Sequence, residues 1–358
     1  MKTKHLFAMP SSISFWLLSL SASFITSLLI VATYEDDIHR FYLKFYKSVF
    51  IHSEERRSHH LTSGRKYFLN PWIVASNAYE SSLKILKVHA SPKNDRDCAN
   101  VLAASNQLLA ISSKSATTDQ LLLPYSISFT YNLKPGFISS MAQARASVVM
   151  LAASKCSTQA QMNEYRKRSK WLLKPVFTPV SEGGSLLSVD HNIWFQEYAQ
   201  GIRILPTVLN GHLFTIESLS HIISLYPEYI PLYQKSLHST CANVSKYDLS
   251  YWSLYDISHD DIAQSTIANV KYHKTHIRQL NDYAYLFPCS DDLRQLGKRF
   301  SAYLGSPINR IKWFAFSGFN KRLNIAYISL FTPAFVVLSI LIRSVVRSRS
   351  RSNRSSQI

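Results

Sequence analysis

The chain has 358 residues, and its 40 Lys and Arg against 22 Asp and Glu give a formal net charge of +18. Hydrophobic residues make up 46% and aromatic residues 13% of the sequence, a composition that excludes a disordered chain. Nine Gly and 13 Pro exclude collagen-like and Pro/Gly low-complexity chains.

The first apolar segment, residues 13–32, carries no charge and has the length at which a helix crosses the hydrocarbon core. Lys2 and Lys4 precede it and acidic residues follow it, so residues 1–12 are expected in the cytoplasm. A cleaved signal peptide is the alternative. The long apolar stretch and the lack of a clear A-x-A site favour an uncleaved transmembrane anchor.

The region after this anchor predicts a stalk and then a helical domain. Residues 35–65 are basic and aromatic and are expected to form a juxtamembrane stalk, either on the lipid surface or as a solvated helix. Over residues 66–305 apolar residues recur at helical spacing, and residues 137–153 have the small side chains of a tightly packed helix. Period-2 alternation is scarce, and residues 185–195 are the best hairpin candidate. The pattern predicts one all-α domain of helical hairpins.

The four cysteines, Cys98, Cys156, Cys241 and Cys289, lie far apart and form no CxxC pair. This spacing excludes a zinc ribbon and a thioredoxin motif. One or two disulfide bridges remain open if the domain lies outside the cytosol.

The second apolar segment, residues 323–342, also carries no charge, and a membrane helix tolerates its Pro333. Five arginines in residues 343–358 are typical of a basic cytoplasmic tail, and a small RNA-binding tract is the less favoured interpretation. Two crossings put both termini in the cytoplasm. The domain between them is then expected in the periplasm or in the ER or Golgi lumen.

Four sequence blocks in the central domain form a recognisable set. They are PGFISSMAQARA (135–146), GGSLLSVDHNIWFQEY continuing into VLNGHLF (183–214), YWSLYDIS (251–258) and YHKTHIRQL (272–280). Their order and spacing resemble the C-terminal domain of the D-glucuronyl C5-epimerase family, from about Asn70 onward. The resemblance implies an (α/α) toroid of helical hairpins. It also implies conversion of D-glucuronic to L-iduronic acid residues in a glycosaminoglycan such as heparosan or heparan sulfate.

The resemblance gives acid and base roles to the positions that match the family's tyrosines: Tyr198, Tyr255 and Tyr272. Epimerisation at C5 removes a proton beside a carboxylate and returns it to the opposite face, so it needs an acid/base group on each face of the sugar. A tyrosine fits this role if its pKa is brought below the usual value of about 10.

Other polar residues in or near these blocks are expected to bind the substrate: Glu197, Asn210, Arg203, Asp256, His259 and His276. Vertebrate members of the family carry an arginine shortly after the YD pair, where this chain has Ser258. Arg203 or His259 is therefore expected to meet the uronate carboxylate. His276 is four residues from Tyr272, and the two share a face if the stretch is helical. His273 and His276 have no third ligand at a recognisable spacing, so neither metal nor cofactor is predicted.

The predicted partners are an anionic uronic-acid polysaccharide and the lipid membrane, with no nucleic acid. Residues 35–66 are too short for the β-domain that precedes the toroid in the family. In the family this β-domain contributes to the substrate cleft. A second copy of the chain in a homodimer, or another protein of polysaccharide biosynthesis, remains a possible source of that part of the cleft. Three alternatives stay open: a uronate polysaccharide lyase, a non-catalytic polysaccharide-binding protein favoured by Ser258, and a membrane scaffold with nucleic-acid contacts through its tail.

Overall fold

We describe the protein from a computed structural model. The residues that it describes are 12–46, 70–87, 95–114, 119–189, 191–259, 264–318 and 321–355. They are mostly helical with a few short strands, which confirms the prediction of a mainly helical protein. The predicted stalk beyond Tyr46 and nearly all of the N-terminal segment 1–12 lie outside the described residues. The chain divides into two compact units, residues 1–61 with 303–358 and residues 62–302.

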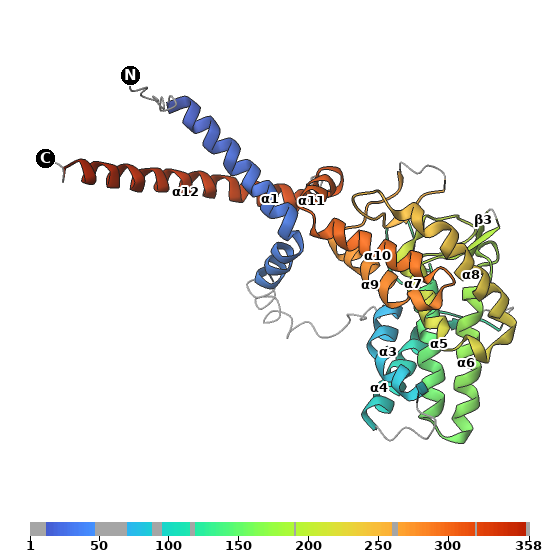
Figure 1. Cartoon of the computed structure of the whole chain (residues 1–358). Coiled ribbons are helices and arrows are strands. Elements are labelled where there is room, and N and C mark those ends of the chain that lie inside the picture. Colours follow the sequence, from blue (N-terminus) through green and yellow to red (C-terminus); the bar gives the residue numbers. More distant parts are fainter. Residues whose placement is uncertain are drawn as a thin grey trace. The chain divides into compact units, whose positions relative to one another are not determined.

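The first unit contains the two apolar segments. Its elements are α1 (Ser12–Tyr46), α11 (Pro307–Trp313), η8 (Phe314–Gly318) and α12 (Arg322–Ser355) (Figure 1). Trp16–Glu35 in α1 and Arg322–Val345 in α12 are long and apolar enough to cross a membrane, by length and composition. The two helices pack together, and the Thr332 hydroxyl donates a hydrogen bond to Ser27 Oγ at 3.3 Å.

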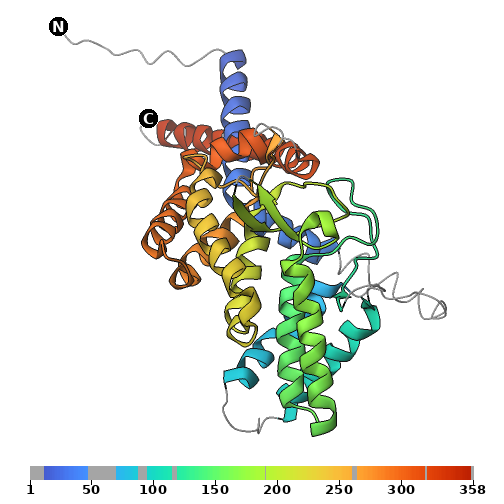
Figure 2. The ribbon, with the colours of Figure 1, turned by 90° about the vertical axis from the view of Figure 1, so that its right-hand side faces the viewer.

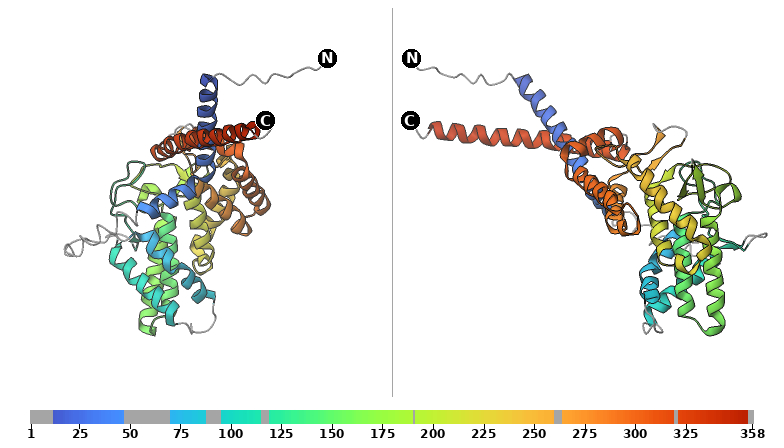
Figure 3. Two further views of the ribbon diagram at one scale, coloured as in Figure 1. Left: turned by 90° about the vertical axis from the view of Figure 1, so that its left-hand side faces the viewer. Right: turned by 45° about the vertical axis from the view of Figure 1, so that its right-hand side comes forward.

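The second unit is built from consecutive helices. These are α3 (Pro71–Lys87), α4 (Asp95–Ile111), α5 (Ser140–Lys155), α6 (Gln159–Phe177), α7 (Leu209–Ser220), α8 (Ile230–Asn243), α9 (Val270–Asp282) and α10 (Ser290–Gly305). Helices α5 and α6 lie side by side as a hairpin, and α3 and α4 pack beside them (Figures 2 and 3). Every residue of α5 from Ser140 to Ser154 is buried, which explains its run of Ala and Ser: small side chains let α3, α4, α6 and α7 approach it closely.

Among the described residues, three two-stranded antiparallel sheets connect the helices. They are β1 (Ser113–Lys114) with β2 (Leu121–Leu122), β3 (Leu186–Val189) with β4 (Asn192–Phe195), and β5 (Thr207–Val208) with β6 (Asp256–Ile257). The β3–β4 pair confirms the predicted hairpin in 185–195. Glu197 and Tyr198 come just after β4, β5 runs directly into α7, and Tyr255 comes just before β6. The strands therefore determine where Glu197, Tyr198, Tyr255 and the start of α7 lie.

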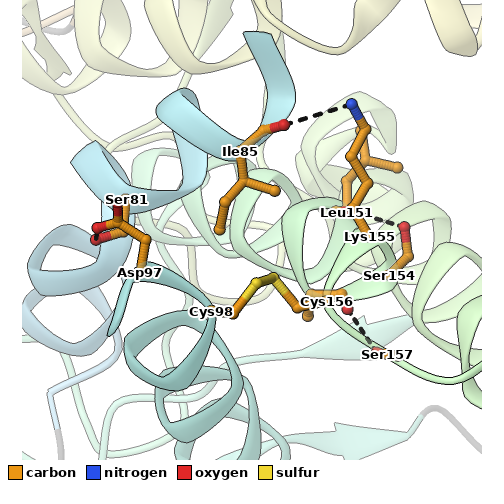
Figure 4. The surroundings of a disulfide bond; sticks show 10 residues. Ser81, Ile85, Asp97, Cys98, Leu151, Ser154, Lys155, Cys156 and Ser157 are labelled. Atoms are coloured by element: carbon orange, nitrogen blue, oxygen red, sulfur yellow. Dashed lines mark hydrogen bonds between the residues drawn. A yellow bond between two sulfur atoms is a disulfide. The ribbon is translucent and has the colours of Figure 1, made fainter. Parts of the chain in front are cut away.

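Two disulfides cross-link the helices of the second unit. Cys98 in α4 is bonded to Cys156 at the end of α5, and Cys241 in α8 is bonded to Cys289 just before α10. Around the first bond, the Ser81 hydroxyl donates to Asp97 Oδ1 at 2.7 Å and Lys155 Nζ donates to the carbonyl oxygen of Ile85 at 3.4 Å (Figure 4). The bond thus fixes α4 to the buried helix α5.

Removing the first bond is expected to destabilise the second unit. The Cys98–Cys156 bond spans 58 residues, and loop-closure entropy gives such a cross-link a contribution of about 4 kcal/mol to the free energy of unfolding. Urea unfolding of the Cys98→Ser, Cys156→Ser double variant, followed by circular dichroism, measures the loss. The wild type treated with reductant is the matched control. A midpoint equal to that of the oxidised wild type would contradict the pairing.

Candidate active site

A cleft of about 710 Å³ lies in the second unit. One side is aromatic and apolar and the other is the basic, solvent-facing side of α9. Its lining residues are Asn70, Trp72, Ile73, Tyr125, Ile127, Phe129, Phe137, Met141, Glu197, Tyr198, Asn210, Phe214, Lys271, Tyr272, Lys274, Thr275 and Arg278. This combination of apolar walls and a few polar groups is typical of a ligand site.

Backbone hydrogen bonds hold the segment that carries Glu197 and Tyr198. The Ser140 N–H donates to the carbonyl of Gln196 at 3.1 Å, while Ile138 and Ala199 exchange two backbone hydrogen bonds at 3.0 and 2.9 Å. The segment after β4 is thus tied to the start of the buried helix α5. Both side chains therefore stand on a rigid support, as a precise site requires.

The structure brings the three predicted tyrosines together. The hydroxyls of Tyr198 and Tyr255 lie 3.3 Å apart, and the ring centroids of Tyr255 and Tyr272 lie 4.6 Å apart. Tyr272 is placed by the start of α9, where the Asn269 side chain accepts a hydrogen bond from its backbone N–H at 2.9 Å. We call Tyr198, Tyr255 and Tyr272 the tyrosine cluster.

Glu197 is buried against the tyrosine cluster. Its carboxylate accepts a hydrogen bond from Asn210 Nδ2 at 3.2 Å, and the hydroxyls of Tyr198 and Tyr255 lie beside it. Burial raises the pKa of Glu197 to about 7, although these polar neighbours favour the charged form and lower it in part. A carboxyl group poised near neutral pH can both accept and release a proton under ordinary conditions.

The pKa values of the three tyrosines are raised, so the condition for a tyrosine base is not met here. Burial, the largest cause, and the neighbouring Glu197 carboxylate raise the pKa of Tyr198, Tyr255 and Tyr272 above the usual value. At neutral pH the three hydroxyls therefore keep their protons.

The pKa of Glu197 predicts the pH dependence of the reaction. If the ionised carboxylate is required, kcat/KM should rise with pH through about 7. The Glu197→Gln variant should be slower by about 10²-fold or more and should lose this ionisation. Initial rates measured between pH 5 and 9 test both statements. A profile that is flat in the wild type across this range would contradict the assignment.

Stability should respond to the same ionisation with the opposite sign. The folded-state pKa of Glu197, about 7, lies above the ordinary value of 4.5, so the fold favours the neutral acid. This stabilisation is complete below pH 4.5 and is lost as pH rises through 7, by about 3 kcal/mol in total. The Glu197→Gln variant should not show this loss. Urea unfolding at pH 5 and pH 8 measures the free energy of unfolding of both proteins.

Asn210 has an acceptor that faces no protein donor. Asn210 is 3% exposed, and among the described residues its Oδ1 has no hydrogen-bond partner. A buried carbonyl oxygen without a donor is costly unless a ligand or water supplies one. Because Asn210 lines the cleft, this position suits a sugar hydroxyl.

The structure places four predicted substrate-binding residues outside the cleft. His276 is completely buried, and its Nδ1 lies 2.9 Å from Ser253 Oγ. Burial lowers the pKa of His276 to about 3, so it stays neutral. It misses the cleft because the buried face of α9 is centred on His273, His276 and Leu280, whereas Tyr272 lies at the border of that face.

The other three are Arg203, Asp256 and His259. Arg203 donates to the backbone carbonyls of Tyr131 and Asn132, at 3.0 and 3.5 Å from its Nη2 and Nη1. Asp256 is buried and accepts hydrogen bonds from the Tyr131 hydroxyl and from the Thr266 N–H. His259 is exposed and lines a separate pocket of about 130 Å³. The structure therefore does not bring Arg203, Asp256 or His259 to the lining of this cleft.

Sequence reasoning missed the cations that line the cleft. Lys271, Lys274 and Arg278 lie at spacings of three and four residues on the solvent-facing side of α9. This spacing was a usable signal, since positions i, i+3 and i+7 share one face of a helix.

The aromatic end of the cleft has a buried cation behind it. The Arg145 guanidinium lies 4.2 Å from the ring centroid of Trp72 and 4.0 Å from that of Tyr79, and its Nη2 is 3.3 Å from Glu217 Oε2. Arg145 thus supports Trp72 from within the protein and pairs with a carboxylate.

The cleft thus brings together a buried carboxyl group, tyrosine hydroxyls and a row of cations. A family model described as D-glucuronyl C5-epimerase C-terminus matches residues 119–301. The chain belongs to this family. The match contains Glu197, the tyrosine cluster and the basic side of α9, whereas α3 and α4 precede it.

Proposed function

We propose that the protein is an epimerase that converts D-glucuronic acid to L-iduronic acid residues in a polysaccharide of the heparosan or heparan type. The family implies C5 epimerisation of glucuronic acid. The observation that carries the proposal is the contact of Glu197 with Tyr198 and Tyr255 in a cleft that also presents Tyr272 and several cations. A carboxylate base and a hydroxyl acid meet the need for two proton-transfer groups.

In the proposed mechanism Glu197 takes the C5 proton. The electron pair left at C5 delocalises into the uronate carboxyl group, and Lys271, Lys274 or Arg278 stabilises the added negative charge. Tyr272 then donates its hydroxyl proton to the opposite face of C5. The raised pKa of a buried tyrosine makes the resulting tyrosinate a strong base, so it recovers a proton readily.

The tyrosine cluster supplies the return path for this proton. The hydroxyls of Tyr198 and Tyr255 are hydrogen-bonded at 3.3 Å beside Glu197, and the ring centroids of Tyr255 and Tyr272 lie 4.6 Å apart. The proton held by Glu197 after the first step passes along these hydroxyls to the Tyr272 tyrosinate. The site then returns to its starting state without an added cofactor.

We also propose that the domain works outside the cytoplasm, anchored by α1 and α12, with both termini in the cytoplasm. Two observations support this placement: each helix contains a segment of membrane-crossing length, and the described cysteines are paired in disulfides. Disulfides form and persist in oxidising compartments. An (α/α) toroid is the arrangement we propose for the helical hairpins of the second unit.

The experiment that tests the function is C5 proton exchange in deuterated water. The full chain in detergent is incubated with heparosan, and NMR follows the loss of the C5 proton signal and the growth of iduronate signals. Exchange with iduronate supports the epimerase. An unsaturated product that absorbs in the ultraviolet would indicate a lyase. Polymer binding without exchange would indicate a non-catalytic protein.

The cations of α9 are expected to set the affinity for the polymer. Lys274→Ala with Arg278→Ala should raise KM by about tenfold and weaken its dependence on salt, because two charges that face the anionic substrate are lost. Lys235→Ala with Lys298→Ala is the matched control, since these exposed lysines lie on α8 and α10 outside the cleft. Equal KM values for the two double variants would refute a binding role for this side of α9.

A further inference from the structure

The loop at residues 129–133 contains an unusual turn. Phe129 N–H donates to the Leu133 carbonyl at 3.0 Å, and Leu133 N–H donates to the Thr130 carbonyl at 3.3 Å. The two central residues, Tyr131 and Asn132, have φ values of 60° and 55°. Positive φ at both central positions defines a type I′ turn, which favours Asn, Asp or Gly. A tyrosine at the first position is strained, so other contacts must stabilise it.

Two groups from distant parts of the chain hold this turn. The Tyr131 hydroxyl donates to the buried carboxylate of Asp256. The Arg203 guanidinium donates to the carbonyls of both central residues, with Nη2 at 3.0 Å from the Tyr131 oxygen and Nη1 at 3.5 Å from the Asn132 oxygen. Asp256 therefore holds the turn through the Tyr131 side chain, and Arg203 holds it through the backbone.

The turn packs directly on the tyrosine cluster. The ring centroids of Tyr131 and Tyr198 lie 5.9 Å apart, and those of Phe129 and Tyr198 lie 5.2 Å apart. Asp256, which holds the Tyr131 hydroxyl, is the residue after Tyr255, and the backbone N–H of Tyr255 is itself bound to the Thr266 carbonyl at 2.7 Å. The same support thus reaches Tyr198 through its ring and Tyr255 through its backbone.

We propose that Tyr131 is a positioning residue, held in a strained turn by Asp256 and Arg203, and that it fixes the ring of Tyr198, which lines the cleft, against Tyr255. This inference rests on the proposed function for its kinetic consequence. It gives Arg203 a role in holding backbone rather than in binding the uronate. Positioning acts on the chemical step, so its loss lowers kcat and leaves KM nearly unchanged.

The test compares two variants of the full chain in the C5 exchange assay. Tyr131→Phe keeps the ring and removes the hydroxyl bound to Asp256, and Arg203→Ala removes the bonds to both carbonyls. Each is expected to lower kcat by about 10-fold to 100-fold, with KM within twofold of the wild type. A raised KM with unchanged kcat in Arg203→Ala would overturn the proposal, because it would show that Arg203 binds the polymer. Unchanged kcat in Tyr131→Phe would overturn it as well.

Ser250→Gly is the matched control for backbone strain. Ser250 has a φ of 63° and lies outside the cleft, so this substitution relieves a strained position and should leave kcat and KM unchanged. The unfolding midpoint is measured for every variant. If kcat falls in proportion to the unfolding midpoint in all of them, Tyr131 has only a structural role and the proposal is overturned.

A second readout separates this inference from the proposed function. With 3-fluorotyrosine incorporated at position 198, the ¹⁹F chemical shift should change in Tyr131→Phe and stay constant in Tyr285→Phe, since Tyr285 is 65% exposed. If the wild type exchanges no C5 proton, the proposed function fails, and the ¹⁹F shift alone decides the positioning role. An unchanged shift in Tyr131→Phe would overturn that role whatever the activity.

Discussion

Replacement of Tyr255 by phenylalanine is expected to reduce C5 proton exchange by about 10³-fold. The Tyr255 hydroxyl lies beside Glu197 and is hydrogen-bonded to the Tyr198 hydroxyl at 3.3 Å, so its loss interrupts the proposed return path between Glu197 and Tyr272. The phenyl ring keeps the packing against Tyr272, 4.6 Å between centroids, and the fold should be retained. Deuterium incorporation at C5, measured by NMR at saturating heparosan, gives the rate.

Two controls accompany this variant. Tyr285→Phe removes an exposed hydroxyl outside the cleft and should exchange like the wild type. Circular dichroism should show equal helicity and an unfolding midpoint close to the wild type. A Tyr255→Phe rate within about threefold of the wild type would show that the hydroxyl takes no part in proton transfer and would require a different acid.

Replacement of Gly211 by alanine is expected to displace Glu197 and lower kcat/KM by about 10²-fold or more. A Cβ at position 211 would lie 2.3 Å from Glu197 Oε2 and 2.4 Å from Glu197 Cβ, closer than atoms approach. Gly211 lies in the first turn of α7, where alanine suits the backbone. The substitution therefore acts through the carboxyl group, and the pH profile near 7 should shift or disappear.

The stability of this variant should change much less than its activity. Overpacking costs about 1–3 kcal/mol, and the helix propensity of alanine offsets about 1 kcal/mol of that. Gly305→Ala is the matched control, because a Cβ there meets no atom within 4 Å. Full activity in Gly211→Ala would mean that Glu197 has room to move without consequence, and it would remove Glu197 from the proposed mechanism.

The helical architecture was predictable because it follows from local patterns. The stretch at 137–153, rich in small side chains, predicts a tightly packed helix, and α5 is buried on every side. The β3–β4 hairpin likewise follows from alternation within a short segment. The pairing of Cys98 with Cys156 could not be predicted from the sequence, since four cysteines permit three connectivities and their spacing alone does not choose among them.

The candidate site was predictable only where motif and geometry coincide. Glu197, Tyr198, Asn210 and Tyr272 line the cleft. His276 shows why the rest failed: a spacing of four residues places two side chains near one another but does not say which of them faces the core. The role of Arg203 depends on a strained turn some 70 positions earlier in the chain, a contact that no local pattern reveals.

The order of the disulfides along the chain has a consequence for biosynthesis. Cys98 pairs with Cys156 and Cys241 with Cys289, so each cysteine joins the next unpaired one in the order of translation. In the proposed placement outside the cytoplasm, a chain oxidised as it emerges from a translocation channel would reach this pairing by closing each loop before the next cysteine arrives, so that no crossed pair has to be corrected.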